Sequence, residues 1–97
     1  MATAKTTSTW SLIDYTDVWE NEEEGEFIVN DQTVLFDDLV ITDDASDQDI
    51  LKYLCDIHYL VTDDEELVHL EDYGDGMIEI VDTEIGYPLG RLQKNCY

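Results

Sequence analysis

Positive charge is what this chain has least of. Its 97 residues include four Lys and Arg residues against 25 Asp and Glu residues, for a formal net charge of −21. Such a chain repels other polyanions, so the composition argues against direct binding to nucleic acid and to anionic membrane surfaces. It also disfavours a phosphorylated substrate, because few cations are available to hold one.

Long apolar runs and cysteines are scarce as well. No run reaches about 18 apolar residues, so we expect no membrane span. The first ten residues, MATAKTTSTW, lack the apolar core of a signal peptide. The two cysteines, Cys55 and Cys96, do not make a disulfide framework. We therefore expect reduced thiols and a cytoplasmic protein.

Motifs for catalysis and metal binding are missing too. The chain has no GxSxG, no phosphate-binding glycine loop and no HExxH. Acidic pairs are so frequent that finding two carboxylates together carries no information about catalysis. The calcium-loop pattern is met by neither DDASDQD nor DYGDGMIE. Cys55, His58, His69 and Cys96 make a poor zinc set. We predict no enzyme, no catalytic residue, no metal and no cofactor.

Hydrophobic residues, by contrast, are plentiful. They make up 43% of the chain, which is too many for an obligately disordered acidic tail. The length suggests one domain, residues 1–97, with residues 1–8 frayed. We expect Trp10, Trp19, Phe27 and Phe36 to lie in the core. Some tyrosines could be exposed among the acids, the candidates being Tyr15, Tyr53, Tyr59 and Tyr73, but core or half-buried packing is favoured for each of them.

The clearest helix runs from Ser46 to Leu60. Ser46 is a favourable N-cap, with Asp49 three positions on as a capping-box partner. Apolar residues then recur at helical spacing from Ile50 to Val61, which predicts one buried face.

Strand patterns lie on both sides of this helix. We predict strands at Thr9–Trp19, at Glu26–Asn30 and at Thr33–Ile41, the last two separated by a turn at residues 30–32. After the helix, residues 66–73 and 77–82 predict a hairpin through Gly74-Asp75-Gly76. Residues 85–92 read as an ordered loop or an edge strand. The order βββαββ predicts an α+β domain, with one main helix packed on a small antiparallel sheet.

The acids are concentrated as well as numerous. All of them lie between Asp14 and Glu84, and Lys52 is the only base in that window. Rows of carboxylates on strands and helices have spacings of about 5–7 Å, and rows of that kind can approximate the dense charge of duplex DNA. We therefore predict a partner-binding surface made of the acids around the helix and a second row near residue 22: Asp37, Asp38, Asp43, Asp44, Asp47, Asp49, Asp56, Asp63, Asp64, Glu65 and Glu66, with Glu20, Glu22, Glu23 and Glu24.

One segment carries a resemblance. Residues 15–31, YTDVWENEEEGEFIVND, resemble a segment of small phage proteins that reads approximately Y-D-V-W-x-N-x-E-x-G-[FY]-x-V-N-D, with one residue inserted near Thr16. In size and charge the whole chain is similar to phage anti-restriction and anti-CRISPR proteins that mimic DNA. This resemblance implies a partner from a bacterial defence system.

Together these features suggest an inhibitor of a host nucleic-acid-binding defence complex. The expected partner is a basic nucleic-acid-binding protein or a Cas complex, met in the cytoplasm of the infected cell. An anti-CRISPR protein that blocks DNA binding comes first and an anti-restriction protein second. Two alternatives stay open: a salt-adapted acidic structural or interaction domain, and a weak calcium-binding module that uses Glu22–Glu24 or Asp63–Glu66.

Overall fold

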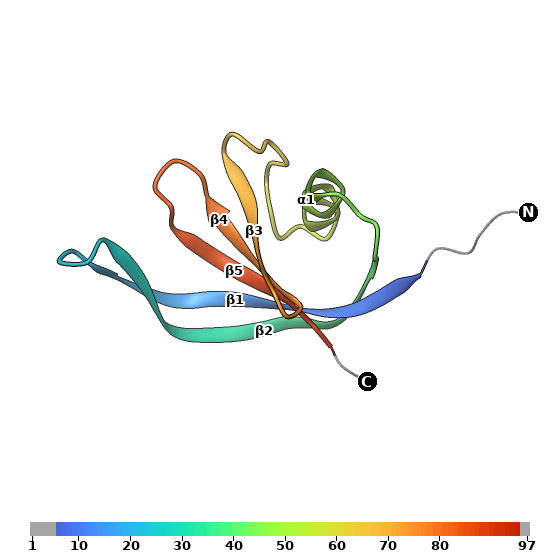
Figure 1. Cartoon of the computed structure of the whole chain (residues 1–97), viewed down its shortest axis with the longest axis horizontal. Helices are drawn as coiled ribbons and strands as arrows, with labels where there is room; N and C mark the ends of the chain where they lie inside the picture. The colour runs from blue at the N-terminus through green and yellow to red at the C-terminus, as the bar shows by residue number, and fades with distance from the viewer. Residues whose placement is uncertain (1–5, 96–97) are drawn as a thin grey trace, which may run out of the picture.

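One antiparallel sheet organises the protein. A computed structural model describes residues 6–95. The elements are β1 (Thr7–Asn21), β2 (Glu26–Thr42), α1 (Asp47–Asp56), β3 (Val68–Gly74), β4 (Met77–Asp82) and β5 (Pro88–Lys94). The sheet order is β2-β1-β5-β4-β3 (Figure 1). The α+β expectation fits this fold broadly, but the predicted order βββαββ is wrong, because two strands precede the helix and three follow it.

The predicted order has one strand too many before the helix, because it divides β2 into two strands at a turn over residues 30–32. Residues 26–42 form one continuous strand, in which Gln32 pairs with Tyr15 and Asp31 pairs with Asp17. The register shifts between the Asp17–Asp31 and Val18–Val29 pairs, so β2 has one residue more than β1 there. The segment read as a turn is therefore a β-bulge, which lets an extra residue leave the ladder without ending the strand.

The segment read as a loop or edge strand is the central strand. β5 lies between β1 and β4 and pairs with both of them. Pro88 is its first residue, a position where proline is tolerated in a sheet. Gly90 lies where neighbouring atoms come very close: a Cβ there would be 2.4 Å from the Tyr59 hydroxyl and 2.5 Å from the Ile13 carbonyl oxygen. Only glycine fits this position without movement of its neighbours.

The helix begins as predicted and ends early. The Asp49 N–H donates to Ser46 Oγ and the Ser46 N–H donates to the Asp49 carboxylate, both at 3.2 Å, which confirms the capping box. His58 then takes a left-handed conformation, with φ of 65°. Its N–H bonds the Cys55 carbonyl at 3.0 Å, and the Tyr59 N–H bonds the Leu54 carbonyl at 2.9 Å. This Schellman motif ends α1 at Asp56, so the predicted extension to Leu60 is wrong.

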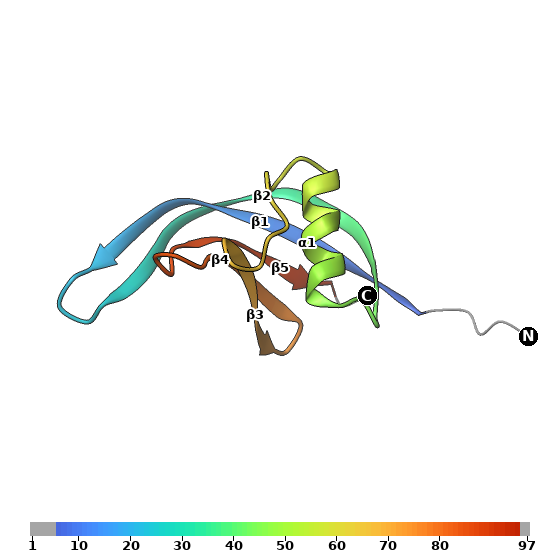
Figure 2. The ribbon, with the colours of Figure 1, turned by 90° about the horizontal axis from the view of Figure 1, so that it is seen from above.

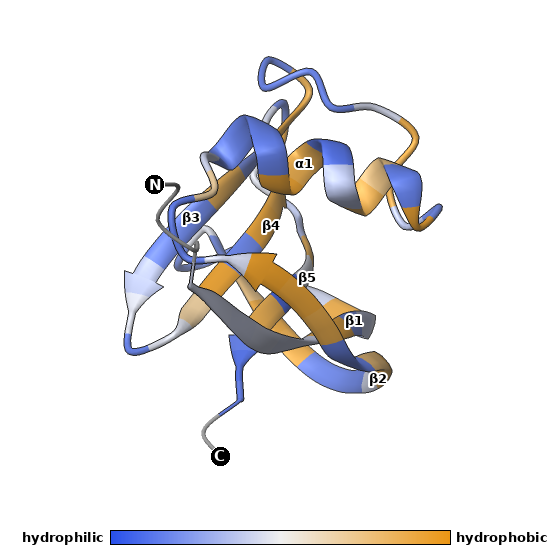
Figure 3. Ribbon diagram, turned by 90° about the vertical axis from the view of Figure 1, so that its right-hand side faces the viewer, coloured by the Kyte–Doolittle hydropathy of each residue, from blue (hydrophilic) through white to orange (hydrophobic). Residues whose placement is uncertain are grey.

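The core lies between α1 and one face of the sheet. Ile50, Leu51 and Leu54 are the buried residues of the helix. They pack on buried side chains from every strand: Leu12, Leu39, Ile41, Val68, Leu70, Ile78, Ile80 and Leu92. Figure 3 shows the hydrophobic segments of the sheet beneath α1.

Some residues expected in the core lie at the surface. Val61, predicted on the buried helix face, is fully exposed because the chain has already left the helix. The side chain of Trp19 is 60% exposed and that of Phe36 is 39% exposed. Trp19 lies in the part of β1 beyond its pairing with β5, and Phe36 lies in β2, the edge strand of the sheet.

The β1–β2 hairpin gives the molecule its elongated shape. Its turn projects beyond the other strands, at the opposite end from α1 in two perpendicular views (Figures 1 and 2). The principal dimensions are 56 × 30 × 24 Å. Of the residues expected to be frayed, Thr7 and Ser8 belong to β1 and pair with Thr42 and Ile41, whereas residues 1–5 lie outside the described part.

Candidate interaction surface

The acidic residues lie on the surface of this fold. No charged side chain among residues 6–95 is buried. Four Lys and Arg residues cannot neutralise 25 acids, so most of the negative charge faces solvent. The acids therefore contribute nothing to the core and are available to a partner.

The predicted site residues occupy two separate ends of the molecule. Near α1 lie Asp43 and Asp44 in the turn before it, Asp47, Asp49 and Asp56 in the helix, and Asp63, Asp64, Glu65 and Glu66 in the loop before β3. Asp37 and Asp38 lie within β2, at the edge of the sheet. Glu20, Glu22, Glu23 and Glu24 lie at the tip of the β1–β2 hairpin. Figure 1 shows this tip at the far end from α1, so the structure does not bring the two rows together.

A groove of about 240 Å³ lies near the start of α1, and Asp43 and Asp47 line it together with Asp72 and Lys94. Hydrogen bonds from the Ser8 and Thr6 hydroxyls hold the pKa of Asp43 below its usual value. Asp72 was not predicted as a site residue, because only the pairing of β3 with β4 carries it to this position. Lys94 offsets part of the charge here.

The loop between α1 and β3 is a well-ordered acidic segment. The Gln48 side-chain amide donates to the Asp63 carbonyl at 3.1 Å and to its carboxylate at 3.2 Å. The Leu67 and Val68 N–H groups both donate to the Asp64 carbonyl. The Thr83 hydroxyl donates to the Glu65 carbonyl at 3.3 Å. Contacts from α1, β3 and the β4–β5 connection therefore hold the backbone of this loop and the carboxylate of Asp63.

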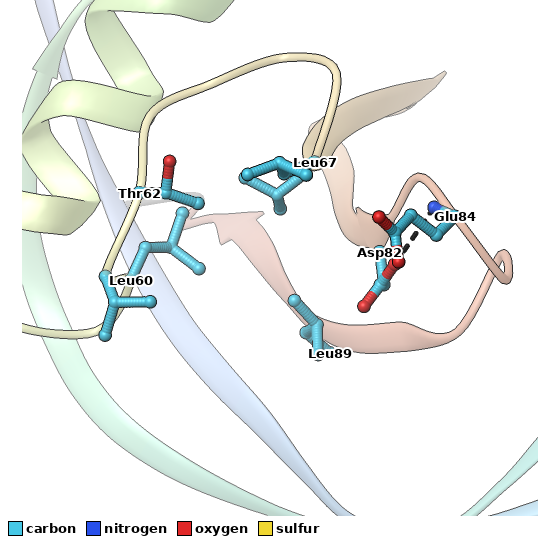
Figure 4. Close-up of a pocket in the computed structure, with 8 residues that line it drawn as sticks. Leu60, Thr62, Leu67, Asp82, Glu84 and Leu89 are labelled. Carbon is cyan, nitrogen blue, oxygen red and sulfur yellow. Dashed lines mark hydrogen bonds between the residues drawn. The ribbon is translucent and has the colours of Figure 1, made fainter.

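A pocket of about 230 Å³ opens beside this loop. Figure 4 shows the Leu60, Leu67 and Leu89 side chains converging on it, with Asp82 and Glu84 at one side. The Glu84 N–H donates to the Asp82 carboxylate at 3.0 Å, which orients that side chain. No sequence pattern indicates this pocket, because its walls come from two separate parts of the chain, residues 60–68 and residues 82–89.

The face of the sheet away from α1 carries a polar network. Arg91 donates to Gln32 at 2.7 Å, and its guanidinium lies 5.8 Å from the centre of the Tyr15 ring. The Tyr15 hydroxyl donates to Glu79 at 3.1 Å, and the Tyr73 hydroxyl lies 3.0 Å from the Glu71 carboxylate and 3.2 Å from that of Glu79. Burial and these carboxylates raise the pKa of both tyrosines, so the phenols stay protonated and keep donating.

Neutral donors hold acids elsewhere too. Asp17 accepts from the Asn30 side-chain amide at 2.8 Å and from the Trp19 indole at 3.2 Å. Asp14 accepts from the Tyr59 hydroxyl at 2.9 Å. Hydroxyl, indole and amide groups thus orient these carboxylates and leave their negative charge in place. A lysine or arginine at the same position would orient the carboxylate and also neutralise it.

Across residues 6–95 the structure groups no three His, Cys, Asp or Glu side chains in a way that could hold a metal ion. Cys96 lies outside the described residues. Within the same range, no helix has the length and apolar character needed to cross a membrane. Comparison of the chain with protein families, curated proteins and solved structures gave no match.

Proposed function

We propose that this protein inhibits a host nucleic-acid-binding defence complex by presenting a DNA-like acidic surface. An anti-CRISPR protein that blocks DNA binding by a surveillance complex is the first candidate, and an anti-restriction protein is the second. It would come from a phage or mobile element, act in the cytoplasm of the infected cell and perform no catalysis. The observation that carries the proposal is the orientation of surface carboxylates by neutral donors.

Such donors matter because they order charge without cancelling it. Asp43 accepts a hydrogen bond from the Ser8 hydroxyl, Asp63 from the Gln48 side-chain amide and Asp17 from the Asn30 side-chain amide, all of them uncharged groups of the same chain. A partner rich in Lys and Arg then meets carboxylates whose positions are already set, so less side-chain entropy is lost on binding. Counterions would leave the acidic face on binding, as they leave DNA.

The dimensions are compatible with this mechanism. At 3.4 Å per base pair, the long axis of 56 Å corresponds to about 16 base pairs of duplex DNA. A duplex of that length carries about 33 phosphates, and this chain has 25 acidic residues. The charge density is thus of the same order, although it is not arranged in two continuous strands.

The salt-adapted alternative also explains the exposed acids, but it differs from DNA mimicry in the salt concentration at which the protein must be folded. A salt-adapted domain needs molar salt to suppress its self-repulsion, whereas an inhibitor must be folded at physiological ionic strength. Within the described part of the chain, no group of acidic side chains that could hold a metal ion favours the calcium-binding alternative.

A competition experiment tests the proposal. The tagged protein is incubated with bacterial lysate at physiological salt, with and without excess duplex DNA, and the recovered complexes are purified. Displacement of labelled duplex from the purified complex is then measured directly. Recovery of a surveillance complex or restriction enzyme that DNA and high salt both displace would support mimicry.

Two triple variants with equal charge change locate the surface. D63K/D64K/E65K alters the loop beside α1, and E22K/E23K/E24K alters the hairpin tip. We expect at least one of them to abolish DNA displacement, and the variant that remains active serves as the control for net charge. Unchanged displacement by both variants would exclude these two clusters as the DNA-like surface, and unchanged displacement after charge reversal at every acidic cluster would refute DNA mimicry.

A further inference from the structure

We propose that the pocket beside the α1–β3 loop binds one large aliphatic side chain from a basic, extended segment of a partner protein. This inference rests on the proposed function for the basic character of the partner. It adds to that function an apolar anchor, which charge mimicry alone does not contain.

The pocket has the shape of an anchor site. Leu60, Leu67 and Leu89 form its apolar walls, and Val68 connects its floor to the core (Figure 4). A cavity of about 150 Å³ is large enough to admit a benzene ring. The 230 Å³ available here therefore accommodates a leucine-sized side chain.

Apolar groups remain exposed around the opening. Val61 lines the pocket and is fully exposed, and Leu67 is 45% exposed. The hydrogen bonds of Asp64, Glu65 and Thr83 hold the loop that carries them, so the site is formed before a partner arrives. Preformed apolar pockets are where interface energy concentrates.

The rim decides what kind of partner fits. Asp82 and Glu84 line one side, and the loop brings Asp63, Asp64, Glu65 and Glu66 to the same region. A segment with lysines or arginines on both sides of an aliphatic residue complements this arrangement. A second copy of the chain does not, because each copy carries a net charge of −21 and the rims would repel one another.

Two synthetic peptides test the anchor on the full-length protein. One is Lys-Arg-Lys-Leu-Lys-Arg-Lys, and the other has serine in place of leucine. Because the two have equal charge, any difference in affinity reports the aliphatic group. We expect the leucine peptide to bind about tenfold more tightly by calorimetry, from partial burial of one leucine side chain. The preference should persist at higher salt, where both affinities fall.

Variants assign the preference to this pocket. V61S/L67S should reduce the affinity ratio between the leucine and serine peptides to less than about twofold, because Val61 and Leu67 both line the opening. V40S is the matched control: Val40 is 54% exposed but lies in β2, outside the pocket, and the preference should remain. Melting curves check that all three proteins are folded.

The outcomes separate the two proposals. Equal binding of both peptides to the parent protein, or a preference that V61S/L67S leaves intact, would overturn the anchor and leave charge mimicry standing. A pocket-dependent preference in a protein that fails to displace DNA would support the anchor and remove the proposed function.

Discussion

Replacing Gly90 with alanine should destabilise the protein severely, because the centre of the sheet has no room for a methyl group. Gly90 pairs with Asp14 of β1 on one side and Ile80 of β4 on the other. A Cβ at this position would lie 2.4 Å from the Tyr59 hydroxyl and 2.5 Å from the Ile13 carbonyl oxygen. The first contact is with the far end of a side chain, and the second is with the backbone of a neighbouring strand.

Two effects contribute to the expected loss. Overpacking of this kind costs about 1–3 kcal/mol, as side chains and backbone move apart. The Tyr59 hydroxyl, which donates to the Asp14 carboxylate at 2.9 Å, must also move away. A hydrogen bond to a charged group contributes about 1.5–3 kcal/mol, less where solvent reaches it. We therefore expect G90A to lose about 3–4 kcal/mol, a large share of the roughly 5–15 kcal/mol typical of a domain.

Urea denaturation followed by circular dichroism measures this loss. Y59F removes the hydroxyl that the new methyl group would meet but leaves the Ile13 carbonyl in place. G90A should therefore cost about 1 kcal/mol less in the Y59F background than in the parent, a coupling that a double-mutant cycle detects. A G90A protein within about 0.5 kcal/mol of the parent would show that β1 and β5 are not packed as described.

Four further predictions concern other parts of the fold. H58G should stabilise the protein by about 0.5–1 kcal/mol in urea denaturation, because glycine adopts the left-handed φ of 65° without strain. S46A should cost about 1 kcal/mol in the same assay through loss of the N-cap, and S46D should restore most of it. Burial and Asp14 raise the pKa of Tyr59. The contribution of its hydroxyl to the free energy of unfolding is therefore complete below the unfolded tyrosine pKa of about 10 and is lost as the pH rises through the folded pKa. Y59F should flatten this alkaline decline in the free energy of unfolding. Sodium chloride should raise the melting temperature by screening the net charge of −21, and a fall would contradict the surface electrostatics.

Local signals predicted local structure well. The capping box located the start of α1, and Gly74 and Gly76 marked the β3–β4 hairpin, because both depend on neighbouring residues. The early end of the helix was not readable, since His58 is not the glycine that usually adopts a left-handed C-terminal position. β5 was misread because Pro88 and Gly90 are typical of loops, and what makes Gly90 suitable is contact with Tyr59, 31 positions earlier.

The sequence was enough to predict that the acidic residues lie at the surface, but not how they are placed relative to one another. Acidic content alone indicated that the acids lie outside the core, but it could not show that the hairpin tip is remote from α1. Strand pairing alone determines where three further acids lie in the candidate surface: Asp72, Asp82 and Glu84. The Leu60–Leu67–Leu89 pocket had no sequence signal, since isolated leucines are most often core residues.

The position of β5 also has a consequence for how the chain folds. β1 and β2 form one hairpin, β3 and β4 form another, and within residues 6–95 β5 is the one strand that joins them in the sheet. On the ribosome both hairpins are made before β5 emerges, so neither can acquire its final neighbour until residues 88–94 have left the exit tunnel. Pairing β1 with β5 closes a loop of more than 60 residues, a step that slows folding. Until then, repulsion between chains that each carry a net charge of −21 opposes the association of unpaired strand edges.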